Sequence, residues 1–193
     1  PNHPQVFEAA GLTTRTYPYL DATAGGLDLD GLLSALGAAT PGDVVVLHAC
    51  CHNPSGVDPT PGQWDAIAAL VGERGLWPLL DLAYQDLGSG MEEDAYGVRR
   101  VLAAVPEAIV AYSCDKNFGL YRDRTGALYV MMAEPVQLKA AMSNGHALAR
   151  ANWSQPPDHG AAAARIVMED DGLVEVRRKE FLVPDMDALR RLL

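Results

Sequence analysis

Two patterns of apolar positions alternate along residues 15–132. Short runs rich in β-branched and other apolar residues predict strands, whereas apolar residues spaced three and four positions apart predict helices. The predicted strands are 15–20, 44–48, 76–82, 109–113 and 127–132, and the predicted helices are 27–39, 64–71 (followed by a stop at Gly75) and 96–105. This alternation is typical of an α/β fold, in which a mainly parallel sheet carries helices on both faces.

The pattern changes after Pro135, where helical spacing continues without strands between the helices. The predicted helices are 135–150, 160–168 and 173–193. Pro184 is expected to kink or end the last of them, because proline removes a backbone donor and clashes with the preceding turn. We therefore expect an α/β domain over residues 1–133, followed by a helical segment over residues 134–193.

Composition and charge exclude several classes of partner. The chain is 49% hydrophobic and 21% charged, which is ordinary for a soluble globular protein. The net charge is −10, and acidic residues surround the densest cationic cluster, 177–179, so we expect no nucleic-acid partner. No apolar stretch approaches the roughly 18 residues that a membrane span needs, so we expect no membrane partner.

The cysteines and the two ends of the chain add two expectations. Cys50, Cys51 and Cys114 form an odd set without a C-x-x-C pair, which favours a reducing, cytoplasmic location. No signal-peptide pattern opens the sequence. Because the chain begins with Pro1 and its last helical pattern runs to Leu193, we expect it to be a piece of a longer protein.

Polar side chains gather directly after three of the predicted strands, in segments 48–56, 81–84 and 113–116. Ligands of open parallel sheets bind at the carboxyl ends of the strands, so these segments are expected to form one site. The site would combine an amide, an aspartate with a phenol, and an amine.

Lys116 is the most informative residue of these segments. It follows the apolar run 108–112 and has hydroxyl and guanidinium groups within eight residues. Such a lysine suits an amine that forms a Schiff base beside a bound phosphate. Pyridoxal phosphate needs this amine, a carboxylate for its ring nitrogen, donors for its ring oxygen, and hydroxyls with an arginine for its phosphate.

Other interpretations of these residues stay open at this point. Asp81 could cap the following helix, and Tyr84 could be a core aromatic with a satisfied hydroxyl. Segment 48–52 contains histidines and cysteines, but no second ligand pair lies at zinc-finger spacing, so we expect no metal site. Segment 53–56 alone is a good turn.

Four longer segments together resemble the class I aminotransferases of fold type I, in the aspartate and aromatic amino-acid aminotransferase group. The segments are 48–59 (HACCHNPSGVDP), 81–99 (DLAYQDLGSGMEEDAYGVR), 113–126 (SCDKNFGLYRDRTG) and 150–160 (RANWSQPPDHG). The resemblance implies that residues 1–133 are part of the large, cofactor-binding domain and that the helical segment leads towards a missing small domain. It also implies pyridoxal 5′-phosphate as the cofactor and a homodimer as the assembly.

The resemblance implies a role for each matching residue. The implied catalytic residues are Lys116, Asp81 and Tyr84; the implied cofactor contacts are Lys116, Asn53, Asp81, Tyr84, Ser113 and Arg124; the residues behind Asp81 are His3 and His48; and the substrate-binding residue is Arg150. Lys116 would form the aldimine, and Asp81 would pair with the ring nitrogen. Arg150 would reach the neighbouring subunit's site and bind the side-chain carboxylate of a dicarboxylic substrate.

The implied activity is ping-pong transamination between an amino acid (aspartate, an aromatic amino acid, or both) and a 2-oxo acid. A related fold type I lyase or decarboxylase is one alternative, and a non-catalytic module that keeps the fold is another. Family members are considerably longer. They carry a glycine-rich phosphate loop, an aromatic residue that stacks on the cofactor and a small domain, which this segment lacks, so we expect the isolated segment to be inactive.

Asp115 departs from the family, which usually has serine next to the reactive lysine. A carboxylate that faced the phosphate at about 4 Å would be repelled by roughly 4 kcal/mol per pair of unit charges at an effective dielectric near 20. We therefore predict that Asp115→Ser tightens binding of pyridoxal phosphate, unless the carboxylate turns away from it.

Overall fold

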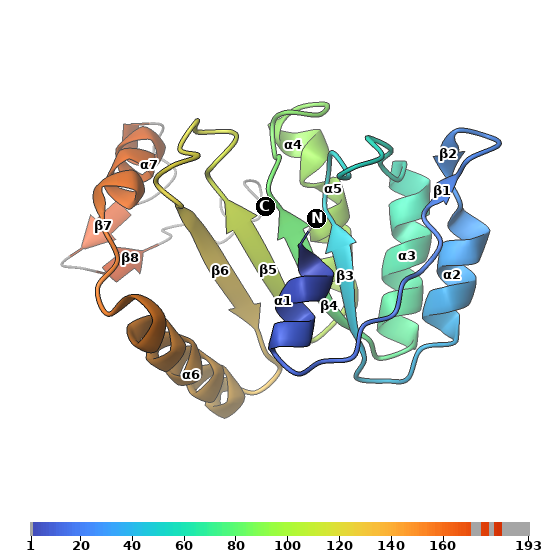
Figure 1. Cartoon of the computed structure of the whole chain (residues 1–193), viewed down its shortest axis with the longest axis horizontal. Coiled ribbons are helices and arrows are strands. Elements are labelled where there is room, and N and C mark those ends of the chain that lie inside the picture. The colour runs from blue at the N-terminus through green and yellow to red at the C-terminus, as the bar shows by residue number, and fades with distance from the viewer. Residues whose placement is uncertain (1, 171–174, 178–179, 183–193) are drawn as a thin grey trace.

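A four-stranded sheet forms the centre of the molecule (Figure 1). The computed structural model describes residues 2–170, 175–177 and 180–182. The strands of the sheet, in spatial order, are β3 (Val44–His48), β4 (Trp77–Leu82), β5 (Ala108–Ser113) and β6 (Gly126–Met131). The first three run parallel and β6 runs antiparallel to β5, which confirms the predicted mainly parallel sheet.

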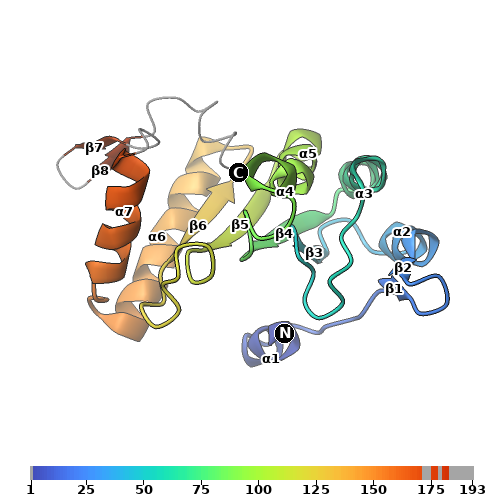
Figure 2. The same cartoon turned by 90° about the horizontal axis from the view of Figure 1, so that it is seen from above.

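Helices lie on both sides of this sheet. They are α1 (His3–Ala9), α2 (Leu29–Gly37), α3 (Pro61–Glu73), α4 (Met91–Asp94), α5 (Tyr96–Ala104), α6 (Pro135–Trp153) and α7 (His159–Asp170). Figure 2 shows α3 and α5 on one side and α1 on the other. Helix α6 contacts the edge strand β6 and continues into α7. No helix among the described residues is long and apolar enough to cross a bilayer.

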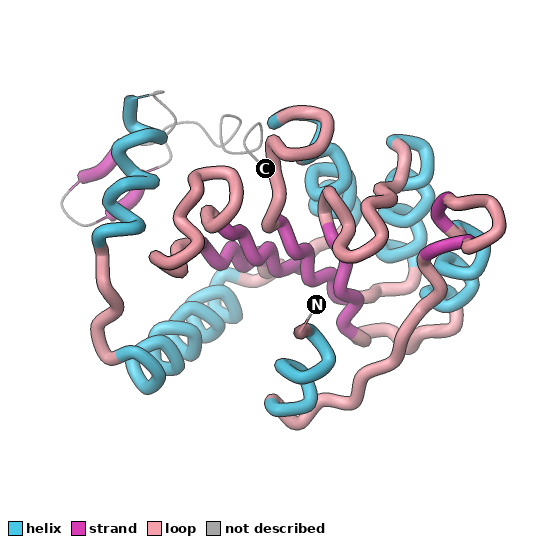
Figure 3. The backbone as a smooth tube through the Cα atoms, turned by 45° about the horizontal axis from the view of Figure 1, so that its top comes forward, coloured by secondary structure: helices cyan, strands magenta, loops and turns pink. Residues whose placement is uncertain are grey.

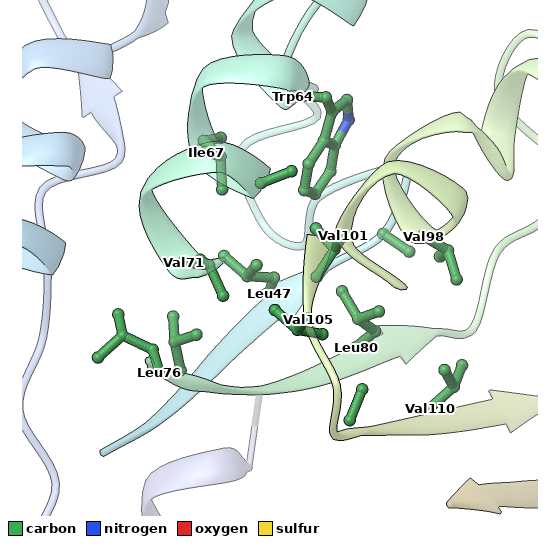
Figure 4. Close-up of a cluster of buried hydrophobic side chains, with 14 of the residues drawn as sticks. Leu47, Trp64, Ile67, Val71, Leu76, Leu80, Val98, Val101, Val105 and Val110 are labelled. Carbon is green, nitrogen blue, oxygen red and sulfur yellow. The ribbon is translucent and has the colours of Figure 1, made fainter. Parts of the chain in front are cut away.

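The hydrophobic core lies between the sheet and the helices α3 and α5 (Figure 4). Every second residue of a strand points to the same face, so β4 buries Leu80 and Leu82 completely beneath these helices. Helix α3 contributes Trp64, and a Cβ atom added at Gly97 of α5 would lie 2.2 Å from the Trp64 ring. The two helices pack closely because residue 97 has no side chain.

Local signals explain the ends of α3. The Thr60 hydroxyl accepts a hydrogen bond from Gln63 N, and the Gln63 side chain accepts one from Thr60 N, which forms a capping box. At the other end Gly75 has a φ of +60°, a conformation that favours glycine. The predicted stop at this glycine is therefore confirmed.

The predicted strand 15–20 is wrong for most of its length. Only Leu20 joins a strand, β1 (Leu20–Asp21), which pairs with β2 (Gly26–Leu27). The preceding segment contains Pro18, which cannot donate to a ladder. Side chains anchor this segment instead, because the Tyr17 hydroxyl donates to Val46 O at 2.7 Å and the Tyr19 hydroxyl donates to Val57 O at 2.7 Å.

The end of the chain is also only partly helical. Helices α6 and α7 confirm the predictions for 135–150 and 160–168. The predicted helix 173–193 is wrong over β7 (Glu175–Arg177) and β8 (Glu180–Leu182), which form an antiparallel pair. Val176 and Phe181 pair across the two strands, and branched and aromatic residues favour strands over helices. Pro184 lies outside the described residues.

Candidate active site

The groups expected to carry chemistry lie at the carboxyl edge of the three parallel strands. His48 at the end of β3 pairs in register with Asp81 of β4, which in turn pairs with Ala111 of β5. Figure 3 shows the loops that follow these strands gathered along this edge. Segments far apart in sequence therefore reach one region of the molecule.

Asp81 is held by a histidine from the opposite side of the sheet. Its Oδ2 lies 2.9 Å from Nε2 of His3, which helix α1 places over the face not covered by α3 and α5. Both side chains are half-buried. The His48 ring stands edge-on to the His3 ring, with the two ring centroids 5.2 Å apart. The structure thus brings together the aspartate and the two histidines that were expected behind it.

His48 is fixed in one tautomer by the loop that follows it. Its Nδ1 accepts a hydrogen bond from Asn53 N at 3.2 Å, so the neutral ring carries its proton on Nε2. Burial lowers the pKa of His48 below the usual value, although the nearby Asp81 carboxylate opposes this shift. His48 is therefore neutral at pH 7.

His52 and Tyr19 extend this cluster, although neither was among the expected site residues. Their rings stack with centroids 3.7 Å apart, and the ring centroids of His52 and His48 are 4.7 Å apart. Burial lowers the pKa of His52 to about 4, and the neighbouring His48 adds to the shift. The signal for His52 was its place in segment 48–56; nothing marked Tyr19, which lies 33 positions earlier.

Asn53 lies exposed in a tightly held loop. The Asp58 carboxylate accepts hydrogen bonds from Cys51 N at 2.6 Å and from His52 N at 2.8 Å, and the Asn53–Pro54 peptide bond is cis. A cleft of about 820 Å³ runs along β3 beside this loop, with Asn53 and His48 in its lining. Tyr84 and Lys116 do not line it, so this cleft alone is not the site expected around the lysine.

Lys116 and Tyr84 lie against each other. The amine of Lys116, in the turn after β5, is 4.9 Å from the centroid of the Tyr84 ring, in the loop after β4. A cation over a ring face is attracted by the ring quadrupole, and this contact orients the amine. Asn117 donates to the Tyr112 hydroxyl at 2.8 Å and ties the same turn to β5. Burial raises the pKa of Tyr112 to about 12, so this phenol stays protonated.

The expected phosphate ligands also lie together, but one of them has another partner. The Ser113 hydroxyl accepts a hydrogen bond from Asp115 N at 3.1 Å. The Arg124 guanidinium donates to the Asp115 carboxylate and, at 2.9 Å, to Tyr121 O. The side chain of Asp115 is 5% exposed, and its Oδ1 has no hydrogen-bond partner among the described residues. The carboxylate that was expected to repel a phosphate is thus paired with the arginine expected to bind it.

Arg150 lies apart from these groups. It is exposed near the end of α6 and donates to Ser154 O at 3.3 Å, within its own helix end. Its expected reach into a neighbouring subunit stays a prediction.

Among the described residues, two sets of side chains have the composition of metal sites. The ligand atoms of His3, His48 and Asp81 lie within 4.8 Å of one another, as do those of Cys50, Cys51 and Asp94. In the second set burial raises the pKa of both thiols, which disfavours the thiolate form that metals bind. Asp94 already accepts hydrogen bonds from Gly88 N at 3.0 Å and Ser89 N at 2.8 Å, which gives it a role in loop structure.

The structure is thus an α/β domain with a candidate site around Lys116 at the carboxyl edge of its parallel strands. The family profile described as aminotransferase class I and II matches residues 1–188, and the chain belongs to this family. This confirms the resemblance stated from the four sequence segments.

Individual relatives support the same assignment. The chain is 49% identical over 173 residues to a tyrosine aminotransferase of Rhizobium meliloti (strain 1021), covering 90% of this chain and 44% of that protein. It is 46% identical over 180 residues to an aspartate aminotransferase of Escherichia coli (strain K12), covering 93% and 46%. A solved aromatic-amino-acid aminotransferase from Burkholderia pseudomallei, covalently bound to pyridoxal phosphate, matches with a TM-score of 0.83 at 42% identity, covering 86% and 42%. The chain therefore spans less than half the length of these relatives.

Proposed function

We propose that the complete protein transfers an amino group between an amino acid and a 2-oxo acid with pyridoxal 5′-phosphate as its cofactor. The observation that carries this proposal is the position of Lys116. Its half-buried amine lies against Tyr84 at the strand-end edge where Asp81 is also placed. The aminotransferase names of the relatives support the same reaction.

The donor groups at this edge fit the cofactor. Asp81 supplies a carboxylate for the ring nitrogen, and Asn53 and Tyr84 supply donors for the ring oxygen. Ser113 and Arg124 supply a hydroxyl and a guanidinium for the phosphate. Asp115 works against this fit, because it already pairs with Arg124.

When bound, pyridoxal phosphate supplies an aldehyde for exchange with amines and a ring that accepts the electron pair released at the substrate α-carbon. The chain itself has to move the proton. We assign that proton transfer to the Lys116 Nζ atom, which Tyr84 holds in a defined direction.

The proposed role at the ring nitrogen requires a negatively charged carboxylate on Asp81, which is half-buried. His3 donates to Oδ2 from Nε2 and fixes the orientation of the carboxylate, which leaves Oδ1 for the ring nitrogen. His48, neutral and held by Asn53 N, stands beside this pair without adding a positive charge. His3 thus positions the Asp81 carboxylate, with the His48 ring packed beside it.

For substrates we propose aspartate, aromatic amino acids, or both, with a 2-oxo acid as the second reactant. Arg150 would bind a side-chain carboxylate in the partner subunit of a homodimer. The free thiols of Cys50, Cys51 and Cys114 favour a cytoplasmic location.

Borohydride labelling of the complete protein tests the proposal. A yellow protein incubated with pyridoxal phosphate and then reduced should carry one cofactor mass on the peptide that contains Lys116. The chain offers two other lysines, Lys139 and Lys179, as internal controls that should stay unlabelled. Labelling of either in place of Lys116, or no labelling, would contradict the assignment.

Product analysis separates transamination from the alternatives. With aspartate or tyrosine as donor and 2-oxoglutarate as acceptor, one 2-oxo acid should form for each glutamate produced. Release of ammonia or carbon dioxide without glutamate would indicate a lyase or decarboxylase. A protein that neither binds pyridoxal phosphate on Lys116 nor forms any product would support the non-catalytic module.

A further inference from the structure

The ion pair between Asp115 and Arg124 engages the arginine that the proposed function assigns to the cofactor phosphate. We propose that Asp115 occupies Arg124 in place of a ligand phosphate, so that this site discriminates weakly between phosphorylated and unphosphorylated pyridoxal. The inference rests on the proposed function and concerns the choice of ligand at the same site.

The geometry favours a durable pair. Arg124 has a φ of +54°, an unusual conformation for arginine, and donates both to Asp115 and to Tyr121 O. The neighbouring Asp123 carboxylate does not take part in this pair, because it lies 2.8 Å from His159 Nε2 on α7. The guanidinium is therefore held on the carboxylate by the fold of the loop.

The two partners are buried to very different degrees, and Asp115 therefore depends on Arg124 more than Arg124 depends on Asp115. The Asp115 side chain is 5% exposed whereas that of Arg124 is 74% exposed. One carboxylate oxygen of Asp115 lacks any hydrogen-bond partner in the described part of the chain, so Arg124 is its main charge compensation. A buried carboxylate without its partner is strongly unfavourable. Asp115 therefore resists any ligand that would draw Arg124 away.

The consequence for a phosphate is a loss of attraction. The charges of the Asp115–Arg124 pair cancel, and one guanidinium nitrogen is already engaged. A phosphate then meets a neutral pair instead of a cation, or has to break a charge-assisted bond. An uncharged hydroxymethyl group in the same position loses nothing. The affinities for pyridoxal phosphate and pyridoxal are therefore closer to each other than they would be at an arginine without this partner.

Equilibrium binding of both ligands to the complete protein tests the inference. Absorbance titrations would compare pyridoxal 5′-phosphate with pyridoxal for the native protein, Asp115→Ser and the nearly isosteric Asp115→Asn. We expect both substitutions to lower the dissociation constant of pyridoxal phosphate by about tenfold or more, which corresponds to about 1.4 kcal/mol. The dissociation constant of pyridoxal should change less than about twofold, because this ligand carries no charge near Arg124.

A double substitution separates the proposed pairing from direct repulsion. If Asp115 acts by occupying Arg124, Asp115→Ser should tighten phosphate binding only while the arginine is present. In an Arg124→Ala background the gain should disappear. A gain that persists there would show that Asp115 repels the phosphate directly, and the inference would be overturned.

Asp123→Ser is the matched control. It removes one carboxylate from the same loop, but that carboxylate pairs with His159 and not with Arg124. It should leave the ratio of the two affinities unchanged, and an equal effect of Asp123→Ser would overturn the inference. Thermal unfolding would establish that every variant is folded.

The outcomes also separate this inference from the proposed function. Pyridoxal phosphate bound on Lys116 with equal affinity in the native protein and both Asp115 variants would refute the inference alone. If neither ligand bound the native protein or the variants, the proposed function would fail and the inference with it.

Discussion

The two faces of the sheet differ in what they hold. On the face beneath α3 and α5, Leu80 and Leu82 of β4 are fully buried. On the opposite face of the same strand, Leu79 and Asp81 are half-buried, and Asp81 meets a histidine from α1. Neighbouring residues of one strand thus serve separate purposes, because alternate side chains point to opposite faces.

This difference between the two faces predicts which property of the protein a substitution will change. A fully buried apolar side chain contributes to stability through the water that it excludes and the atoms that it contacts. A half-buried polar side chain at a strand end contributes little to the core but stays accessible to a ligand. Substitutions on the first face should change the free energy of unfolding, and those near the second face should change ligand binding and turnover.

Lys116→Ala should have the largest effect. Loss of the amine removes both the covalent attachment of the cofactor and the group that moves the proton, so kcat in the complete protein should fall by about 10⁴-fold or more. The melting temperature without cofactor should change little, because Lys116 is only half-buried. Lys139→Ala, on the exposed surface of α6, is the control and should retain full activity. A Lys116→Ala enzyme with native turnover would contradict the assignment.

Leu80→Ala should have the next largest effect, and it should act on the free energy of unfolding. Removing a fully buried leucine leaves a cavity and should cost about 2–5 kcal/mol of unfolding free energy. Leu79→Ala, one position away on the opposite face, should cost roughly half as much or less, since its side chain is only partly removed from water. Urea unfolding measures the loss of unfolding free energy in both variants. Equal losses would show that the two faces contribute equally to stability.

Asp81→Asn should reduce turnover while leaving the fold intact. The amide keeps the shape of the side chain but cannot hold a negative charge at the ring nitrogen. We expect kcat to fall by about 10²–10³-fold, comparable with the loss of a preorganised electrostatic group. Steady-state rates and the urea midpoint of the same preparation give the two readouts. A large stability loss with unchanged turnover would indicate that Asp81 is a structural residue.

His52→Gln should have the smallest effect, visible only as a change in pH dependence. The pKa of His52 is about 4 in the folded protein and near 6.5 when unfolded, so the unfolded chain binds more protons between these values. His52 therefore makes the native protein lose stability as the pH falls from 6.5 towards 4. Urea midpoints measured across that range should decline less steeply in the variant, and an unchanged slope would show that His52 does not titrate as assigned.

The sequence was sufficient where a signal is local. The β-branched run of β3, the apolar spacing of α3 and the glycine after it each act within a few residues, and each is confirmed. The polar segments at the strand ends likewise lie along one edge of the sheet, because parallel strands place their carboxyl ends together.

The sequence was insufficient where partners are far apart or their geometry is unusual. The stacking of Tyr19 on His52 joins residues 33 positions apart and has no periodic signature. The pairing of Asp115 with Arg124 depends on a left-handed backbone at the arginine, which residue type alone does not predict. In the short β7–β8 pair, the spacing of a few apolar residues was compatible with both a helix and a strand.

A crystal structure of the complete protein grown with pyridoxal 5′-phosphate would show directly whether Lys116 and Asp81 meet around the cofactor. We expect density continuous from the Lys116 Nζ atom to the cofactor, with the Asp81 carboxylate within hydrogen-bond distance of the ring nitrogen. A cofactor bound elsewhere would contradict the proposed role of Lys116. An Asp81 carboxylate that stays hydrogen-bonded to His3 but points away from the ring would contradict the proposed role of Asp81.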